Sequence, residues 1–432
     1  VGRLLRLPNA YWESVEQMEP KAAYLEHFKR AGFLIGSDPL PPVMVAEQRR
    51  SMVAEQRRSM VAEQRRSMVA EHKEGCLYTS MKFRFHMTER CQLRCEYCYL
   101  SAGEAGKSLP IEIAKQALQT YLPKNYRGQV EVEFHGGGEP TLAFEAIKAI
   151  VEEVRALPIT PQFRLQTNGL VPREVLDWLL REQVQLSVSI DGSAQIQQLQ
   201  RPGAKGAYQQ MLDTIETLVG AKVSFNTISV VSDYSLHFLE ESYELFKSLG
   251  VRNMLFNPLH ELGRASQGTL SHQKAVDIMA FVQKFLAIRL RADQEGIRVM
   301  SDFLPDFYHY HPRDFQCNAC RPSMCVHVNG DLVACTRAYD VLPRDQNPFI
   351  WAKYEEGIWQ MDESKKTALE NRTLENMPAC QSCLVKWDCA GDCLIELYKK
   401  TGDFYQVDKV RCEAKRWFVQ NYLSAFSDNF LA

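Results

Sequence analysis

Residues 81–98 read MKFRFHMTERCQLRCEYC, and this stretch decides how the whole chain is interpreted. Its first half alternates apolar and polar side chains, as a half-buried β-strand does. Three cysteines, Cys91, Cys95 and Cys98, follow that strand directly. Three thiolates can hold three corners of a cubane iron–sulfur cluster and leave its fourth iron open to a further ligand. The stretch therefore predicts a strand that carries a reactive metal cluster at its end.

Strand-like and helical segments alternate from this stretch to about residue 295. Helical patterns such as those at 110–122 and 172–183 separate the strand-like runs. Six strand–helix units predict a parallel sheet curled into a partial (β/α)6 TIM-like barrel, so the fold class is α/β. The six predicted strands are residues 81–87, 130–136, 163–168, 184–190, 222–231 and 252–259.

The pattern changes on both sides of this barrel, which we place at residues 82–295. Residues 1–81 are predicted to be an N-terminal segment in which an eight-residue repeat, MVAEQRRS, recurs over 44–75. A helix with that period turns its apolar stripe by roughly 80° per copy, so we interpret the repeats as an exposed helix or linker. Binding of a partner is the alternative. Residues 296–432 contain short Cys-, Pro- and Gly-rich segments and are predicted to form a second, small domain.

The composition argues against several classes of protein. Lys plus Arg total 51 against 53 Asp plus Glu, which is not the basic balance that nucleic-acid binding demands. No apolar run is long enough to cross a membrane, and the first residues lack the pattern of a secretory signal. We therefore expect a cytoplasmic protein with no nucleic-acid or membrane partner. Thirteen cysteines in that reducing compartment are interpreted as metal ligands rather than disulfides.

Polar and glycine-rich motifs end the next three predicted strands: HGGGEP at 135–140, QTNG at 166–169 and SVSIDG at 187–192. Each motif alone fits a turn, a helix cap or a phosphate cradle. The C-terminal ends of parallel strands gather on one face of a barrel, so we expect the motifs to converge with the three cysteines on one ligand site. Zinc is the alternative metal, with Cys76 or His86 as its fourth ligand.

The spacing Cys91-x3-Cys95-x2-Cys98, with the aromatic Tyr97 before the last cysteine, resembles the signature of the radical S-adenosylmethionine superfamily. HGGGEP resembles that family's GGEP element. The resemblance implies an enzyme in which an electron from the cluster cleaves S-adenosylmethionine into methionine and a 5′-deoxyadenosyl radical, which takes a hydrogen atom from its substrate. The cofactor-binding residues that it implies are Tyr97, Gly137, Gly138, Glu139, Asn168, Ser189, Asp191 and Arg201.

A second set of cysteines lies near the C-terminus: Cys380-x2-Cys383-x5-Cys389-x3-Cys393, then Cys412, with Gly330-x4-Cys335 upstream. This spacing resembles the SPASM domain, a module that carries auxiliary iron–sulfur clusters; a zinc ribbon is the alternative. The resemblance assigns Cys380, Cys383, Cys389 and Cys412 to one cluster and joins Cys393 to Cys335 at another. Cys317, Cys320 and Cys325 compete for the remaining ligand positions. The whole pattern implies three [4Fe–4S] clusters, one catalytic and two auxiliary.

The same resemblance implies that the chain modifies a ribosomally made precursor peptide by cross-linking, oxidation or backbone excision. Residues 1–90 are too short and too repetitive for a full leader-recognition domain, so we expect a separate leader-peptide recognition protein. Flavodoxin or ferredoxin is the expected electron donor. A non-catalytic iron–sulfur electron-transfer protein is one alternative function.

An anaerobic sulfatase-maturating enzyme, which makes formylglycine, is the other alternative. The pattern of those enzymes has an aspartate, proposed as proton acceptor, directly after the cysteine of the GxxxxC element. Here that position is Thr336, and Asp340 is the next acidic residue along the chain. A threonine hydroxyl is no useful base near neutral pH, so the expected substrate is a peptide other than a sulfatase.

Overall fold

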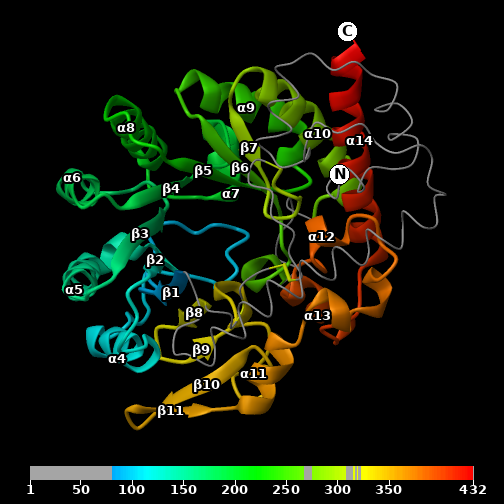
Figure 1. The fold of residues 1–432 in the computed structure, drawn as a ribbon. Helices are drawn as coiled ribbons and strands as arrows, with labels where there is room; N and C mark the ends of the chain where they lie inside the picture. Colours follow the sequence, from blue (N-terminus) through cyan, green and yellow to red (C-terminus); the bar gives the residue numbers. More distant parts are fainter. Residues whose placement is uncertain (1–79, 267–274, 308–314, 317–318, 320–322, 432) are drawn as a thin grey trace, which may run out of the picture.

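The computed structural model describes residues 80–266, 275–307, 315–316, 319 and 323–431 (Figure 1). The repeats at 44–75, Cys76, Cys317 and Cys320 lie outside the described residues. The described strands form one eleven-stranded sheet, and Figure 1 shows the helices α4, α5, α6 and α8 along its outer side.

The first seven strands form the partial barrel that the sequence predicts. They lie side by side in chain order, and every neighbouring pair is parallel. The six predicted strands are confirmed, and the three-residue β7 is an additional one. The strands are β1 Ser80–His86, β2 Gln129–His135, β3 Thr160–Thr167, β4 Gln185–Ser189, β5 Asn226–Val231, β6 Asn253–Pro258 and β7 Arg298–Met300.

Helices connect these strands and cover the outside of the sheet. The helices predicted at 110–122 and 172–183 are confirmed as α4 and α6. Their buried residues recur at helical spacing, as expected of amphipathic helices that pack on a sheet. The connecting helices are α4 Ile111–Tyr121, α5 Phe144–Arg155, α6 Arg173–Arg181, α7 Ala194–Gln200, α8 Ala207–Gly220, α9 Leu239–Ser248 and α10 Ile278–Gln294.

The two faces of the barrel sheet differ in polarity. On β1, Phe83 and Phe85 are fully buried and belong to the main hydrophobic core. Lys82 and Arg84 alternate with them and form ion pairs with Glu133 of β2, at 2.5 and 2.8 Å. Because successive side chains of a strand point to opposite faces, the core side meets the helices and the inner side of the barrel is polar. This polar inner face is suited to bind a polar ligand.

The sheet continues beyond β1 into the cysteine-rich C-terminal part. Strand β8, Ser323–Val326, pairs in parallel with β1, and the antiparallel strands β9 Leu332–Val333, β10 Ile350–Glu355 and β11 Ile358–Met361 extend it. Four helices complete this part: α11 Glu363–Glu370, α12 Lys386–Cys389, α13 Leu394–Thr401 and α14 Lys409–Leu431. The cysteine-rich part is therefore joined to the barrel through a shared sheet as well as through the chain.

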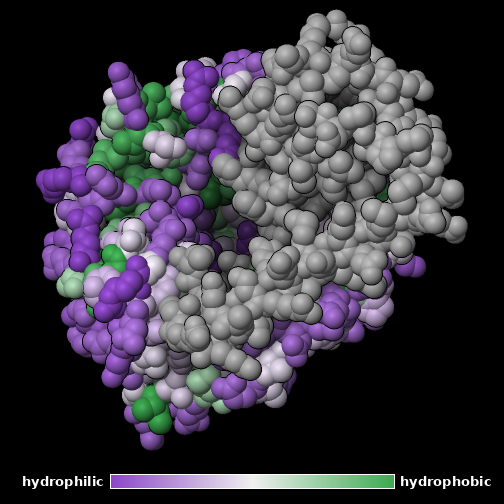
Figure 2. All heavy atoms as spheres, viewed as in Figure 1, coloured by the Kyte–Doolittle hydropathy of each residue, from purple (hydrophilic) through white to green (hydrophobic). Residues whose placement is uncertain are grey.

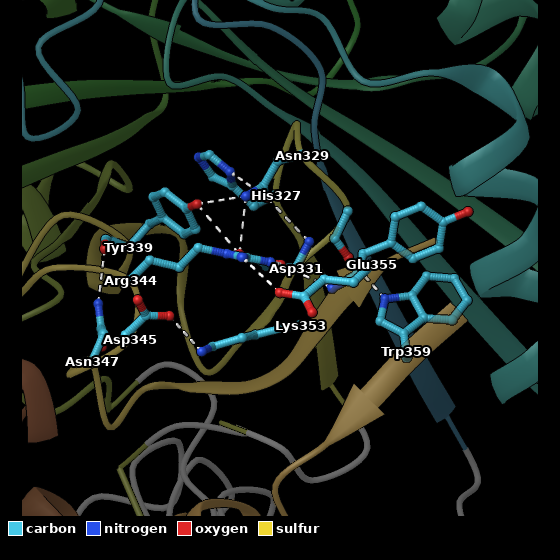
Figure 3. Close-up of polar contacts among 12 residues, drawn as sticks. His327, Asn329, Asp331, Tyr339, Arg344, Asp345, Asn347, Lys353, Glu355 and Trp359 are labelled. Atoms are coloured by element: carbon cyan, nitrogen blue, oxygen red, sulfur yellow. Dashed lines mark hydrogen bonds and ion pairs between the residues drawn. The ribbon is translucent and has the colours of Figure 1, made fainter. Parts of the chain in front are cut away.

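A buried carboxylate organises the turn before Cys335. Asp331 accepts hydrogen bonds from Arg344 through both of its oxygens, at 2.6 and 2.7 Å, and one from the Asn329 side chain at 2.9 Å (Figure 3). The adjacent Gly330 has φ +90°, where glycine alone is unstrained, and its carbonyl accepts the Trp359 indole N–H at 2.8 Å. The Gly330-x4-Cys335 spacing is therefore the geometry of a tight turn that fixes the start of β9.

The C-terminal helix packs on the last barrel helix. The Phe418 ring of α14 lies 5.8 Å from the Phe285 ring of α10, and the buried Arg289 of α10 donates to the Tyr422 hydroxyl at 3.0 Å. No described helix is long and apolar enough to cross a membrane. Figure 2 shows polar residues around a broad apolar area at the upper left, and a separate apolar spot at the lower left, where the β10–β11 hairpin lies. Ile358, beside the turn of this hairpin, is 60% exposed.

Candidate active site

The three cysteines after β1 lie in a loop whose sulfurs accept hydrogen bonds. Cys91 Sγ accepts from the Leu93 backbone N–H at 3.4 Å and from the Asn168 side chain at 3.7 Å. Cys98 Sγ accepts from the Ala102 N–H at 3.4 Å. Such N–H donors stabilise the thiolate form and are among the groups that tune iron–sulfur clusters, so the loop fits a cluster site.

Burial shapes the chemistry of the middle cysteine. It raises the pKa of the Cys95 thiol to about 12, opposed by the charge of Arg201 and reinforced by Cys98 and Cys91. The three thiols therefore lie within electrostatic range of one another. A thiol that is costly to ionise alone becomes a thiolate when a cation binds it. Among the described residues, no three His, Cys, Asp or Glu side chains are arranged to hold a single metal ion.

The glycine-rich loop after β2 packs directly on the cysteine loop. The Gly138 N–H donates to the Thr88 carbonyl and the Glu139 N–H to the Arg90 carbonyl, both at 2.8 Å. A Cβ atom at Gly138 would lie 1.8 Å from the Arg90 carbonyl oxygen, which no side chain can tolerate. At Gly137 it would meet Leu100 at 2.9 Å. The glycines are therefore required for backbone packing between the two loops.

Glu139 is buried, with 1% of its surface exposed, and its carboxylate is tied to its own surroundings. Its Oε1 accepts from the Thr141 N–H and hydroxyl and from the Thr167 hydroxyl, at 3.2, 2.8 and 2.9 Å. Its Oε2 accepts the Asn168 N–H at 2.7 Å. Burial raises the pKa of the Glu139 carboxyl group, although these hydrogen bonds act to lower it. One acceptor position on Oε2 stays open for a ligand, because a carboxylate oxygen has two lone pairs.

Tyr97, Asp191 and Arg201 form one buried polar network. The Tyr97 hydroxyl donates to Asp191 Oδ2 at 2.5 Å and accepts from Arg201 Nη1 at 2.9 Å. Gln200 donates to the same Oδ2 at 2.9 Å, and the Val230 N–H donates to Oδ1 at 2.9 Å. Asp191 is thus held by protein donors, while Arg201 Nε is buried without a hydrogen-bond partner among the described residues. The network joins the cysteine loop to the end of β4.

The remaining predicted cofactor residues lie at the ends of β3 and β4. Ser189 is buried and accepts a hydrogen bond from Gln166 at 3.4 Å. The Asn168 side chain also bonds Gln92 of the cysteine loop at 3.1 Å. The fold therefore brings the residues of all four predicted motifs to the C-terminal ends of β1–β4, as expected for a parallel barrel.

The C-terminal cysteines gather in two groups. Burial raises the pKa of Cys380 to about 12, and its next contributors are the thiols of Cys389, Cys412 and Cys383. Cys393 and Cys335 instead both act on the pKa of Arg337. The charges of Cys335 and Cys325 both raise the pKa of Arg84 in the barrel. Cys393 and Cys335 thus lie around Arg337, and Cys325 lies near Cys335; the division of these cysteines between two clusters stays a prediction.

Between the barrel cysteines and Cys335 lies a set of polar residues whose proximity the sequence did not predict. The Tyr99 hydroxyl lies 3.2 Å from His135 Nδ1 and accepts a hydrogen bond from Thr336. Tyr99 is within electrostatic range of both Cys98 and Cys335. The positive charge of Arg337 lowers the pKa of both Tyr99 and His135. We call Tyr99, His135, His260, Thr336 and Arg337 the inter-cysteine cluster.

His260 belongs to this cluster because the loop after β6 lies over the cysteine loop. The Arg264 N–H donates to the Cys98 carbonyl at 3.0 Å, and a Cβ at Gly263 would lie 2.4 Å from the same oxygen. Arg337 Nη1 lies 2.7 Å from His260 Nε2, and Arg337 Nη2 is paired with Asp302 at 2.5 Å. No sequence spacing could have indicated this set, because its members come from β2, the loops after β1 and β6, and the turn after Cys335.

A family model described as the radical SAM superfamily matches residues 85–246, which contain the cysteine loop and the ends of β2, β3 and β4. Residues 85–246 therefore form a radical SAM domain. The Klebsiella aerogenes serine-type anaerobic sulfatase-maturating enzyme is 26% identical over 320 residues, which are 70% of this chain and 76% of that protein. As a radical SAM protein the chain is an enzyme, and a non-catalytic electron-transfer role is set aside.

Solved structures share the fold of this radical SAM enzyme. A structure of native anSMEcpe with bound AdoMet and Cp18Cys peptide superposes with a TM-score of 0.62 and 17% identity, covering 81% of this chain and 98% of that one. Streptococcus suis SuiB bound to precursor peptide SuiA gives a TM-score of 0.55 and 15% identity over 90% and 87% of the two chains. S-adenosylmethionine and [4Fe–4S] clusters are the cofactors of this radical SAM enzyme.

Proposed function

We propose that this radical SAM enzyme post-translationally modifies a ribosomally made peptide. The observation that carries the proposal is the inter-cysteine cluster, which offers hydroxyl, imidazole and guanidinium groups between the two cysteine sets. A peptide segment, with a backbone donor and acceptor at every residue, can hydrogen-bond such groups. Two structures of the same fold, anSMEcpe and SuiB, are described with bound peptides. The precursor peptide is therefore the proposed partner.

Within this proposal each group of residues has a role. Bound S-adenosylmethionine and the catalytic cluster supply the hydrogen-abstracting radical chemistry. Cys91, Cys95 and Cys98 hold the catalytic cluster. Cys380, Cys383, Cys389 and Cys412 hold one auxiliary cluster, and Cys335 and Cys393 hold the other with ligands from Cys317, Cys320 and Cys325. The cofactor lies against Tyr97, Gly137, Gly138, Glu139, Asn168, Ser189, Asp191 and Arg201.

The chain's own groups orient the cofactor in this proposal. Arg201 is held by Tyr97 at 2.9 Å, which leaves its buried Nε–H to bind the cofactor carboxylate. Glu139 offers its open Oε2 position to the cofactor ammonium, while its four protein donors fix the carboxylate in place. Charge-assisted hydrogen bonds of this kind are stronger than neutral ones. Both side chains are buried, so they exclude water from the cofactor.

Maturation of a sulfatase is the second candidate function, and the similarity to the Klebsiella enzyme favours it. The surroundings of Thr336 weigh against it. Thr336 is buried and bonded to Tyr99, and no carboxylate occupies its position. The Asp340 side chain is exposed at the surface, where partial loss of solvent around the carboxyl group and the charge of Glu89 raise its pKa. It therefore belongs to a different environment from the inter-cysteine cluster.

The remaining expectations form part of the proposal. An enzyme with oxygen-sensitive clusters needs a reducing compartment, so we place it in the cytoplasm with a flavodoxin or ferredoxin donor and a separate leader-peptide recognition protein. We propose the same three parts as the sequence predicts: an N-terminal segment at 1–81, the barrel at 82–295 and the cysteine-rich domain at 296–432. The shared β1–β8 pairing means that the last two divisions act as one structural body.

Two peptides and two proteins test the proposal. The anaerobically reconstituted, reduced enzyme is incubated with the precursor peptide encoded beside its gene and, separately, with a sulfatase-motif peptide. Mass spectrometry should find a modified precursor and no formylglycine. The Cys98→Ala variant should lose the iron of about one cubane, form no 5′-deoxyadenosine and leave both peptides unchanged. Formylglycine in the sulfatase peptide with an unchanged precursor would replace this proposal by the second candidate.

A further inference from the structure

Four described histidines lie in or beside the inter-cysteine cluster, and three of them lie in a row across adjacent strands. His86 at the end of β1 is paired with His135 of β2, and its ring lies 5.3 Å from that of His327, which follows β8. Burial lowers the pKa of all three, that of His135 to about 4. A base with so low a pKa binds a proton weakly near neutral pH.

His260 has different surroundings, because charged groups from three other elements face it. Its Nδ1 lies 3.0 Å from Glu396 Oε1 of α13, and its Nε2 lies 3.4 Å from Asp302 Oδ2, which follows β7. Arg337, in the turn Thr336–Ala338, is the third group. Burial and the charge of Arg337 lower the pKa of His260, but its contacts with Asp302 and Glu396 outweigh them and raise it.

The contact with Arg337 settles which ring nitrogen is free to accept a proton. A guanidinium has only donors, so Nε2 must be the acceptor in its 2.7 Å contact with Arg337 Nη1. Nδ1 then carries the hydrogen and lies 3.0 Å from Glu396 Oε1, an ion-pair contact without hydrogen-bond geometry in this structure. A carboxylate at this distance from an imidazole stabilises the imidazolium after proton transfer. Arg337 keeps its pairing with Asp302 through Nη2 when a ligand displaces Nη1.

We infer that His260 is the proton acceptor for the bound peptide, with Glu396 as its positioning residue. In this step an X–H bond of the substrate, where X is oxygen, sulfur or amide nitrogen, breaks heterolytically. The proton binds Nε2 of His260, and the electron pair remains on X. The imidazolium that forms lies between the carboxylates of Asp302 and Glu396, while Arg337 stays neutralised by Asp302. This inference rests on the proposed function. His260 takes the role of proton acceptor, which the Thr336 hydroxyl is too weak a base to fill.

The test separates hydrogen abstraction from proton transfer. The anaerobically reconstituted wild type, His260→Ala and His260→Asn enzymes are given a uniformly deuterated form of the precursor peptide encoded beside the gene. Deuterium in 5′-deoxyadenosine measures hydrogen abstraction, and the mass change of the peptide measures product. In both variants the ratio of product to deuterium transfer should fall about 100-fold, because loss of a general base costs at least that factor. Added imidazole should restore part of the ratio in His260→Ala.

His237→Ala is the matched control, because His237 is an exposed histidine outside the inter-cysteine cluster. It should leave both readouts and the iron content at wild-type values. If His260→Ala loses iron, His260→Asn decides, since its amide still reaches toward Glu396. A wild-type ratio in either folded variant overturns the inference while leaving the proposed function intact. A wild-type enzyme that neither accepts deuterium nor changes the peptide overturns the proposed function and the inference together.

Discussion

At the scale of single residues, Glu139 has two roles that an experiment can separate. Its position in HGGGEP predicts a contact with the cofactor, but the structure gives its carboxylate four protein donors in a buried site. Removing the carboxylate leaves those donors without an acceptor, and each such loss costs about 1–3 kcal/mol. A residue that served the cofactor alone would have no such effect on the cofactor-free protein.

We therefore expect Glu139→Ala to lower the free energy of unfolding of the cofactor-free chain by about 3 kcal/mol, since the donors can partly regain water. Urea unfolding followed by circular dichroism measures this change. Glu145→Ala is the control, because the Glu145 side chain is 81% exposed and its ion pair is with Lys148 at the surface. Equal stability of the two variants would show that the four hydrogen bonds do not contribute to the free energy of unfolding.

At the scale of elements, two hairpin turns allow a comparison of two glycines. Gly330 lies between β8 and β9, and Gly357 lies between β10 and β11. Gly330 and Gly357 both have positive φ, +90° and +84°, so alanine is strained at either position by about 1 kcal/mol. A Cβ at Gly330 would also lie 2.7 Å from the Tyr354 ring, whereas a Cβ at Gly357 meets nothing within 4 Å. Overpacking of that kind costs a further 1–3 kcal/mol, roughly.

Gly330→Ala should thus unfold at a clearly lower temperature than Gly357→Ala, in differential scanning calorimetry of the reconstituted enzyme. Because Gly330 fixes the start of β9 and the position of Cys335, the variant should also lose iron from one auxiliary cluster, while Gly357→Ala keeps it. Identical calorimetric traces and iron contents would mean that the turn does not position Cys335.

These elements also mark how far sequence reasoning reaches. Alternation and strand-end motifs predicted six parallel strands, because each is long enough to display a pattern and ends in a recognisable turn. β7 and β9 span three and two residues, too short for any period, and their place depends on pairing with distant strands. His260, Asp302 and Glu396 were invisible for the same reason. Only folding brings them together, and none carries a spacing that signals chemistry.

At the scale of the whole molecule, the barrel depends on residues beyond its predicted boundary at 295. β7 covers the β6 edge of the sheet and β8 covers the β1 edge. Helix α14 buries the side of α10 that carries Phe285 and the cation Arg289, which is bonded to Tyr422. A fragment ending at 295 would expose two sheet edges and a buried arginine, and unpaired edges promote aggregation.

We expect residues 1–295, expressed alone, to be insoluble or to lack a cooperative unfolding transition. The full-length double variant Cys380→Ser/Cys383→Ser provides the contrast, because it removes two expected auxiliary-cluster ligands but keeps β7, β8 and α14. It should remain soluble, with the circular dichroism of the wild type and less iron. Size-exclusion chromatography and thermal unfolding of both proteins distinguish the loss of the sheet from the loss of a cluster. A monomeric, cooperatively folded 1–295 fragment would mean that the barrel is autonomous and that the β1–β8 pairing adds little to its stability.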